Sequence, residues 1–116
     1  MKFIKHENTW PWGRSTIIIT NDACGTVTVQ FTKSFPDEGF ITSLSVHKSK
    51  RNKGYGNMLL AEAEKYALEN GATQTALRCD PNSWVVEWYK RHGYVLEGFT
   101  VGEDEDMFPI LSKKLI

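Results

Sequence analysis

The residue types best suited to chemistry lie close together in the range 51–56, which reads Arg-Asn-Lys-Gly-Tyr-Gly. Gly54 and Gly56 allow the backbone to turn tightly and to approach a ligand closely. Arg51, together with the lysines at positions 48, 50 and 53, places positive charge beside them. A helix that begins here would add unpaired N–H groups and the positive end of its dipole, both of which favour a bound anion. The segment therefore predicts a phosphate-binding loop.

Two common nucleotide-binding motifs do not describe this loop. Leu59 stands where a Gly-x-Gly-x-x-Gly dinucleotide motif needs its third glycine, and no Gly-Lys-Ser/Thr follows, as a P-loop would require. The alternative to a phosphate site is a surface turn with a glycine cap and solvated charges. The position of the loop between a predicted strand and a predicted helix favours the phosphate site.

The segments before the loop predict an antiparallel meander. They are rich in β-branched residues or alternate in hydrophobicity, and residues typical of turns separate them. Strands are expected at residues 2–5, 15–20, 26–32 and 40–46, with turns at 10–13, 21–25 and 35–39.

After the loop, apolar residues recur at helical spacing over 54–70, and Gly71 supplies a C-terminal cap. The elements that follow are a strand at 73–79, a helix from 81–83 to His92, and strands at 94–101 and 107–115. Because a helix connects strand 40–46 to strand 73–79, these two strands should run parallel. We therefore expect a single α/β domain spanning 1–116, with a mixed, mostly antiparallel sheet that contains one parallel βαβ pair.

The composition excludes several classes of protein. Lysine plus arginine and aspartate plus glutamate number 14 each, for a net charge of zero, so no bulk charge points to nucleic acid or to an anionic membrane. No apolar run is long enough to span a bilayer. Cys24, Cys79 and the scattered histidines match no metal or redox spacing, so no metal is expected. Since no secretory signal is recognised, a cytoplasmic location is expected.

Two motifs resemble those of the GCN5-related N-acetyltransferase (GNAT) superfamily. The range 51–56 matches its Arg/Gln-x-x-Gly-x-Gly/Ala signature, which lies between a strand and the main helix. The range 82–94 is similar to its Asn-x-x-Ala-x-x-x-Tyr-x-x-x-Gly-Phe motif, with Val85 for the alanine and tyrosine for the phenylalanine. The resemblance covers about residues 15–115 and implies a GNAT-like acyl-CoA acyltransferase fold that is reduced at its N-terminal end.

The resemblance also implies that acetyl-CoA is the co-substrate and that an amine attacks its thioester directly. A backbone N–H would polarise the thioester carbonyl, and Tyr89 would donate a proton to the leaving thiolate as general acid. Tyr89 could instead be a core aromatic residue, and Asn82 could be only an N-cap. The coenzyme-binding residues that the resemblance implies are Leu44, Val46, Arg51, Asn52, Lys53, Gly54, Tyr55, Gly56 and Asn82.

The acceptor half departs from the family pattern. Members usually carry two helices between their first two strands, whereas only about ten residues separate the predicted strands here, and two helices with their connection need more than ~20. The acceptor site should therefore be open, or completed by a second subunit in a homodimer or by the acceptor itself. Trp10 and Trp12 are candidate contacts for such a partner.

The general base is the least defined part of the predicted site. The strand at 40–46, which often carries a base in the family, offers none. Glu38 is the candidate, with Asp37 beside it, and ordinary turn chemistry is the alternative for both. The acidic run 103–106 is a second group of carboxylates, and it predicts a cationic acceptor, with a solubilising hairpin as the alternative.

These observations predict an acetyl-CoA-dependent N-acetyltransferase that acts on a primary amine of a small cationic molecule or of a protein. The alternative is a coenzyme A-binding regulatory module that acts through a protein partner without turnover. The reduced acceptor side favours the module, whereas Tyr89 favours the enzyme. A purely structural interaction domain would leave the Arg51–Gly56 loop unexplained.

Overall fold

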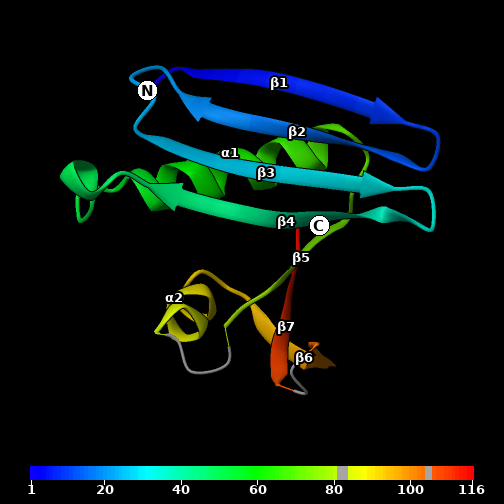
Figure 1. The fold of residues 1–116 in the computed structure, drawn as a ribbon. Helices are drawn as coiled ribbons and strands as arrows, with labels where there is room; N and C mark the ends of the chain where they lie inside the picture. Colours follow the sequence, from blue (N-terminus) through cyan, green and yellow to red (C-terminus); the bar gives the residue numbers. More distant parts are fainter. Residues whose placement is uncertain (81–83, 104–105) are drawn as a thin grey trace.

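The computed structural model describes residues 1–80, 84–103 and 106–116. Within these ranges the chain forms a seven-stranded sheet, in the order β1-β2-β3-β4-β5-β7-β6, and two α-helices (Figure 1). The elements are β1 (Phe3–Trp10), β2 (Gly13–Thr20), β3 (Gly25–Thr32), β4 (Phe35–Val46), the 3-10 helix η1 (Lys48–Lys50), α1 (Tyr55–Glu69), β5 (Gln74–Arg78), α2 (Val85–Arg91), β6 (Val95–Val101) and β7 (Met107–Lys114). The predicted mixed sheet is confirmed: β4 and β5 are parallel, and the other neighbouring strands are antiparallel.

The first two strands are joined directly. β1 pairs with β2 along its whole length, from Phe3 opposite Thr20 to Trp10 opposite Gly13, so Pro11 and Trp12 form the turn. This confirms that no helices separate these strands. The predicted strand at 2–5 was too short, because pairing with the β-branched residues of β2 carries the polar residues that follow it into the sheet.

The turn predicted at 35–39 is wrong, because these residues are the first part of β4. The chain reverses earlier, at Lys33 and Ser34, with Thr32 opposite Phe35. Pro36 is tolerated in this strand because β4 acquires its β5 partner only at Glu38. Glu38 therefore belongs to a paired strand and not to an exposed turn.

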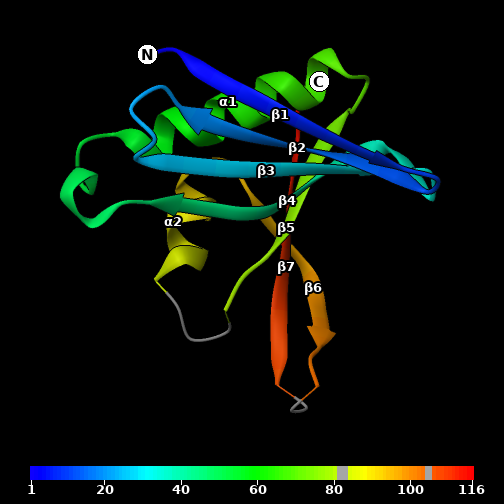
Figure 2. The same ribbon diagram turned by 45° about the horizontal axis from the view of Figure 1, so that its top comes forward.

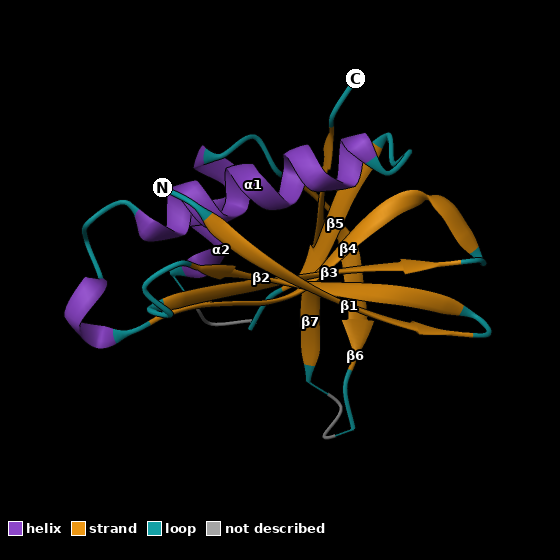
Figure 3. Ribbon diagram, turned by 90° about the horizontal axis from the view of Figure 1, so that it is seen from above, coloured by secondary structure: helices purple, strands orange, loops and turns teal. Residues whose placement is uncertain are grey.

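Helix α1 covers one face of the sheet, across β2, β3, β4 and β5 (Figure 3). The alternation predicted for β3 is confirmed, since Val27, Val29 and Phe31 are buried on that face. The helix meets them with Leu59 and Ala63 among its buried residues, and Leu60, which the sequence pattern did not single out, is buried too. Full burial of a valine or leucine side chain contributes ~1.5–3 kcal/mol, so this layer holds the helix against the sheet.

The strands beyond β4 lead away from the meander. Figures 1 and 2 show β5, β7 and β6 running away from the layer that β1 to β4 form. Helix α2 lies near these strands and contacts the beginning of α1. A Cβ on Gly56 would come within 3.3 Å of the Trp88 ring, and the Asn57 side chain lies 2.9 Å from His92 Nε2. The N-terminus of α1, helix α2 and the end of β4 are thereby brought together.

Candidate active site

The site begins where the two parallel strands separate. β4 and β5 are paired from Glu38 opposite Gln74 to Ile41 opposite Leu77, after which β5 ends at Arg78 while β4 continues (Figure 2). Residues 42–46 of β4 keep β3 on one side and have no β5 partner on the other. On that open side the Val46 carbonyl accepts a hydrogen bond from Arg51 Nε at 3.2 Å, and the other backbone groups lack a β5 partner, so an extended ligand can pair with them.

A β-bulge accompanies the separation. Val29 lies opposite Ile41 and Thr28 lies opposite Ser43, so Thr42 is an extra residue in β4. A bulge bends the strand that contains it and increases its local twist. The bend therefore coincides with the point at which β4 leaves β5.

A cavity of about 330 Å³ occupies this separation. Its described lining comes from the open part of β4, the end of β5, α2 and β7. The lining residues are Ile41, Thr42, Ser43, Leu44, Leu77, Arg78, Cys79, Asp80, Val85, Tyr89 and Phe108. The volume lies within the range of small-molecule pockets. Its walls combine apolar side chains with Thr42, Ser43, Arg78 and Asp80, and polar atoms form more of the exposed wall than apolar atoms do.

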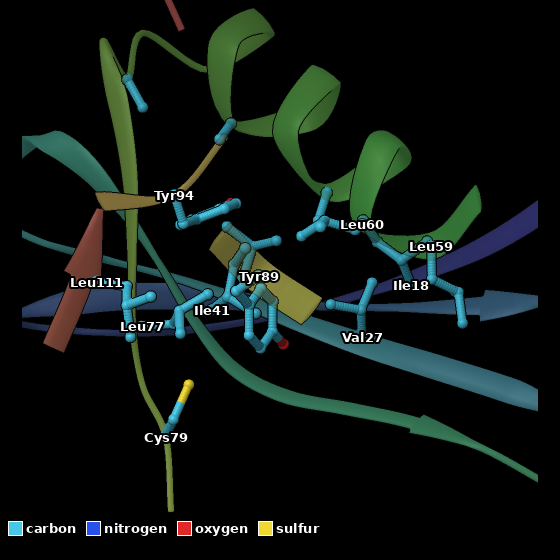
Figure 4. Close-up of a cluster of buried hydrophobic side chains, with 14 of the residues drawn as sticks. Ile18, Val27, Ile41, Leu59, Leu60, Leu77, Cys79, Tyr89, Tyr94 and Leu111 are labelled. Atoms are coloured by element: carbon cyan, nitrogen blue, oxygen red, sulfur yellow. The ribbon is translucent and has the colours of Figure 1, made fainter. Parts of the chain in front are cut away.

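Tyr89 belongs both to the core and to the cavity wall. Its side chain is 6% exposed, and its ring packs edge-to-face against Trp88 and Tyr94, at centroid distances of 4.9 and 5.5 Å. Figure 4 shows it in the same buried cluster as Ile41 and Cys79. Burial raises the pKa of the Tyr89 phenol above its ordinary value, and the nearby Cys79 adds to the shift. The phenol therefore keeps its proton at neutral pH and can act as a proton donor.

Cys79 lies at the end of β5, beside the cavity. Its side chain is buried, and its backbone N–H donates to the Pro109 carbonyl at 3.0 Å, which ties this segment to β7. Burial raises the pKa of the Cys79 thiol to about 11, and the adjacent Asp80 carboxylate contributes to the shift. At neutral pH this thiol is therefore protonated and a poor nucleophile.

The predicted phosphate loop connects the open end of β4 to α1. His47 caps η1 by accepting a hydrogen bond from the Ser49 N–H at 3.2 Å, and the Arg51 Nε donates to the Val46 carbonyl at 3.2 Å. Two residues of the loop have left-handed backbone conformations, Asn52 with φ 63° and Gly54 with φ 83°. The loop therefore follows a compact path that ends at the first turn of α1.

The start of α1 has the properties of an anion site. Gly54 is its N-cap and has no side chain with which to cap the helix, so the first N–H groups depend on other partners. No atom lies within 4 Å of the position that a Cβ on Gly54 would occupy, which leaves space for a ligand there. Gly56 has a different role, because it allows Trp88 of α2 to pack against the helix. These features fit an anion held by α1, with cations of the loop nearby.

The structure brings most of the predicted site residues to one end of the sheet. Leu44 lines the cavity together with Tyr89, Val46 is the last residue of the open strand, and the range 51–56 follows it along the chain. Asn82 lies outside the described residues. Asp104 and Glu105 of the acidic run also lie outside them, while its other two residues are exposed at the end of the β6–β7 hairpin.

Glu38 is separated from these residues. It lies in the paired part of β4, opposite Gln74, and its carboxylate accepts a hydrogen bond from the Gln74 side chain at 2.8 Å. It is not among the described residues that line the cavity. The expectation placed it in a flexible turn, whereas pairing with β5 holds it on the far side of Ile41 from the opening.

Reasoning from the sequence missed Asp80 and Arg78. Both line the cavity, and Asp80 is the one carboxylate among its described lining residues. The guanidinium of Arg78 lies 5.0 Å from the centre of the Phe108 ring. A usable signal was present, because ligands of open α/β sheets bind at the carboxyl ends of parallel strands, and Asp80 follows such a strand.

The described residues contain neither a metal-binding cluster nor a membrane-spanning helix. No group of three or more His, Cys, Asp or Glu side chains is arranged to hold a metal ion in these ranges. None of the described helices is both long enough and apolar enough to cross a membrane.

A family model and a curated relative that match this chain both describe acetyltransferases. The model of the Acetyltransferase (GNAT) family matches residues 3–94. An uncharacterized N-acetyltransferase from Schizosaccharomyces pombe is 33% identical over 75 residues, which are 65% of this chain and 50% of the relative. The match thus spans half the length of that curated relative.

Two solved structures share the fold. Nourseothricin acetyltransferase superposes with a TM-score of 0.73 at 22% identity, over 91% of this chain and 67% of that one. PaiA N-acetyltransferase from Thermoplasma acidophilum, solved in complex with coenzyme A, superposes with a TM-score of 0.69 at 20% identity, over 86% of this chain and 59% of that one. At these identities the likeness concerns the arrangement of elements.

The two cysteines should differ in reactivity. At pH 8 a thiol with a pKa of about 11 is ~0.1% thiolate, and Cys79 is also buried, whereas Cys24 is partly exposed. We expect iodoacetamide to alkylate Cys24 first and Cys79 only slowly, with the Cys79 rate rising as the pH approaches 11. Mass spectrometry of the Cys24→Ser variant isolates the second thiol. Equal labelling of both cysteines at pH 8 would contradict the described environment of Cys79.

Proposed function

The chain belongs to the acetyltransferase (GNAT) family, and from that membership we propose that it transfers the acetyl group of acetyl-CoA to a primary amine. The observation that carries the proposal is the position of Tyr89, which lines the cavity between β4 and β5. The likeness to a family structure solved with coenzyme A supports the choice of coenzyme. We also propose that residues 1–116 act as one domain, since the core cluster includes residues from Ile18 to Leu111.

The coenzyme would follow the open end of β4. Its pyrophosphate would bind at the range 51–56, where the α1 N–H groups and Arg51 offer hydrogen bonds. Its pantetheine arm would lie along residues 42–46, whose backbone is unpaired on the β5 side, with Leu44 and Val46 as proposed contacts. The thioester would then reach the cavity beside Tyr89. Asn82 remains a proposed pantetheine contact from the family motif.

The proposed reaction is a direct transfer. The neutral amine attacks the thioester carbonyl carbon, and a backbone N–H of the open β4 segment stabilises the developing oxyanion. As the tetrahedral intermediate collapses, the C–S bond breaks and Tyr89 donates its proton to the leaving thiolate. The amide nitrogen gives up its extra proton to solvent, and Tyr89 recovers one from solvent, so the enzyme ends unchanged.

Asp80 replaces Glu38 as the carboxylate that we propose for the acceptor. Asp80 is exposed at the end of β5 and lines the cavity, whereas Glu38 bonds to Gln74 away from it. A carboxylate at the opening would attract an ammonium group, because opposite charges favour the charged forms of both. The proposed acceptor is therefore a cationic amine, and the exposed Glu103 and Asp106 add negative charge on the β6–β7 hairpin.

The second candidate function is a coenzyme A-binding module without turnover. The direct Pro11–Trp12 turn favours this module, because such a turn leaves no room between β1 and β2 for elements that would enclose an acceptor. A protein-borne amine or a second subunit would complete the acceptor side if the chain is an enzyme. Trp12, which is 66% exposed, is available for either contact.

A paired measurement separates these functions. Coenzyme A binding is followed by calorimetry, and thiol release from acetyl-CoA is followed with polyamines, amino sugars and lysine peptides as acceptors. Binding with amine-dependent thiol release supports the enzyme, and binding without it across the panel supports the module. An absence of binding overturns both.

Coenzyme A binding should depend on Gly54. In Gly54→Val the side chain forces a left-handed residue into strain and fills the space in front of α1, so we expect coenzyme A binding to be lost. Gly71→Val is the matched control, because Gly71 also has a positive φ, of 93°, and open surroundings, but ends α1 at its other end. The control should lose stability and keep its affinity. Equal affinity in both variants would refute the loop assignment.

Turnover should depend on the Tyr89 hydroxyl. Tyr89→Phe keeps the ring packing, and we expect kcat to fall by roughly 10²-fold, as for a lost general acid, with coenzyme affinity little changed. Tyr94→Phe removes a buried hydroxyl that bonds Thr75 at 2.7 Å and Glu64 at 2.9 Å, outside the cavity lining. It should lower the melting temperature and spare kcat. Unchanged turnover of Tyr89→Phe with chemistry rate-limiting would leave Tyr89 as a core residue only.

Acceptor binding should depend on Asp80. We expect Asp80→Asn to raise KM for cationic amines by about tenfold, the size of a lost charge-assisted hydrogen bond, and to weaken the salt dependence of KM. Asp37→Asn is the control, since Asp37 is exposed on β4 outside the described cavity lining. An identical KM and salt dependence in Asp80→Asn and wild type would remove Asp80 from the acceptor site.

A further inference from the structure

We propose that the turn between β2 and β3, residues 20–25 (the clamp turn), holds the anion-binding loop in its binding shape, and that Asp22 is a positioning residue for the coenzyme. The inference rests on the proposed coenzyme site and assigns a function to a segment that contributes nothing to the cavity lining. Asp22 acts through Tyr55, without contact with the coenzyme itself.

The clamp turn holds the loop at both of its ends. At the beginning, the His47 N–H donates to the Cys24 carbonyl at 2.7 Å. At the end, the Tyr55 hydroxyl donates to Asp22 Oδ2 in a short hydrogen bond. The residues between these two contacts are the cationic and glycine residues of the proposed phosphate site. One turn thus fixes the distance between the end of β4 and the start of α1.

The clamp turn is itself rigid. Thr20 is fully buried, and its hydroxyl donates to Asp22 Oδ1 at 2.7 Å. Thr20 Oγ1 also accepts hydrogen bonds from the N–H groups of Cys24 and Gly25, each at 3.1 Å. Gly25 is also buried, close to Leu59 of α1. A side chain anchored to buried groups in this way can transmit a fixed position to Tyr55.

The loop needs such support because it contains two left-handed residues. Asn52 and Gly54 both have positive φ angles, and a non-glycine residue in that conformation persists only where its surroundings hold it. Asn52 is exposed, so its own packing cannot supply that support. The contacts at His47 and Tyr55 lie on either side of this pair and limit the paths that the backbone can take.

The Asp22 carboxylate is ionised at neutral pH and is the acceptor of the Tyr55 hydrogen bond. The hydrogen bond from Tyr55 lowers the pKa of Asp22 to about 2, with the Thr20 hydroxyl as the next contribution, so the carboxylate stays ionised and fully engaged. The same bond raises the pKa of Tyr55 to about 12, so the phenol keeps the proton that it donates. A charged acceptor makes this bond stronger than a neutral one would.

The test compares tyrosine variants at two places on α1. Tyr55→Phe removes the contact with Asp22 and leaves the bonds inside the clamp turn intact. Tyr66→Phe is the matched control, because the Tyr66 hydroxyl bonds Thr16 at 2.8 Å further along the same helix. We expect Tyr55→Phe to weaken coenzyme A binding by about tenfold, whereas Tyr66→Phe changes only the melting temperature.

Asp22 variants and a shorter ligand identify the mechanism. Asp22→Ala should weaken binding as Tyr55→Phe does, the double variant should be no weaker than either, and Asp22→Asn, which keeps an acceptor, should recover part of the affinity. In turnover, KM for acetyl-CoA should rise with kcat unchanged. S-acetylpantetheine, which lacks the pyrophosphate, should show the same KM in all variants. Additive losses in the double variant would overturn the coupling.

Hydrogen exchange of the ligand-free protein separates this inference from the proposed function. Amides of residues 48–56 should exchange several-fold faster in Tyr55→Phe than in wild type or Tyr66→Phe, because the loop samples more open states. If wild type binds coenzyme A and Tyr55→Phe binds equally well, the clamp is refuted and the function stands. If the wild-type protein does not bind coenzyme A, the proposed function is refuted. In that case, exchange of amides 48–56 that is the same in Tyr55→Phe and wild type would refute the clamp as well.

Discussion

The structure depends on the early separation of one parallel strand pair. β4 and β5 stay together only up to Ile41 and Leu77, and the cavity opens where they separate. The unpaired edge of β4 forms one wall, and α2 fills the opposite side with Tyr89. The extra residue Thr42 bends β4 where the separation starts. A continuous ladder to Val46 would close the cavity and satisfy the backbone groups that a ligand needs.

Much of the fold could be predicted from the sequence because local patterns agree with the global arrangement. Two local patterns correctly indicate which side chains are buried: the alternation of Val27, Val29 and Phe31, and the helical spacing of Leu59 and Ala63. The strand over 35–39 could not be predicted, because Pro36 and Gly39 are typical turn residues and the pairing with β5, which begins at Glu38, is not visible in the local sequence. Pairing between distant segments is tertiary information, and it overrides local propensity.

The candidate site also has one part that the sequence indicates and one part that depends on the fold. The loop 51–56 is a contiguous segment, so it could be proposed as a phosphate site from the sequence and from its resemblance to a family motif. The proposed acceptor side combines residues from different elements, and Asp80 and Tyr89 line one cavity only once β5 and α2 are in place. Glu38, the general base expected from the sequence, is close to the open strand along the chain. Closeness along the chain does not measure distance from the cavity. Tyr89 joins both halves, since its ring belongs to the core while its edge lines the site.

The direct connection between β1 and β2 has a consequence for how the chain folds. The pairs β1–β2, β2–β3 and β3–β4 are all sequence neighbours joined by short links, so the entropy lost in closing each loop is small. The β4–β5 pair must wait for the whole crossover helix, and contacts with large sequence separation form slowly. The four-stranded meander is thus suited to act as the folding nucleus, and the surface on which α1 later docks exists before the helix reaches it.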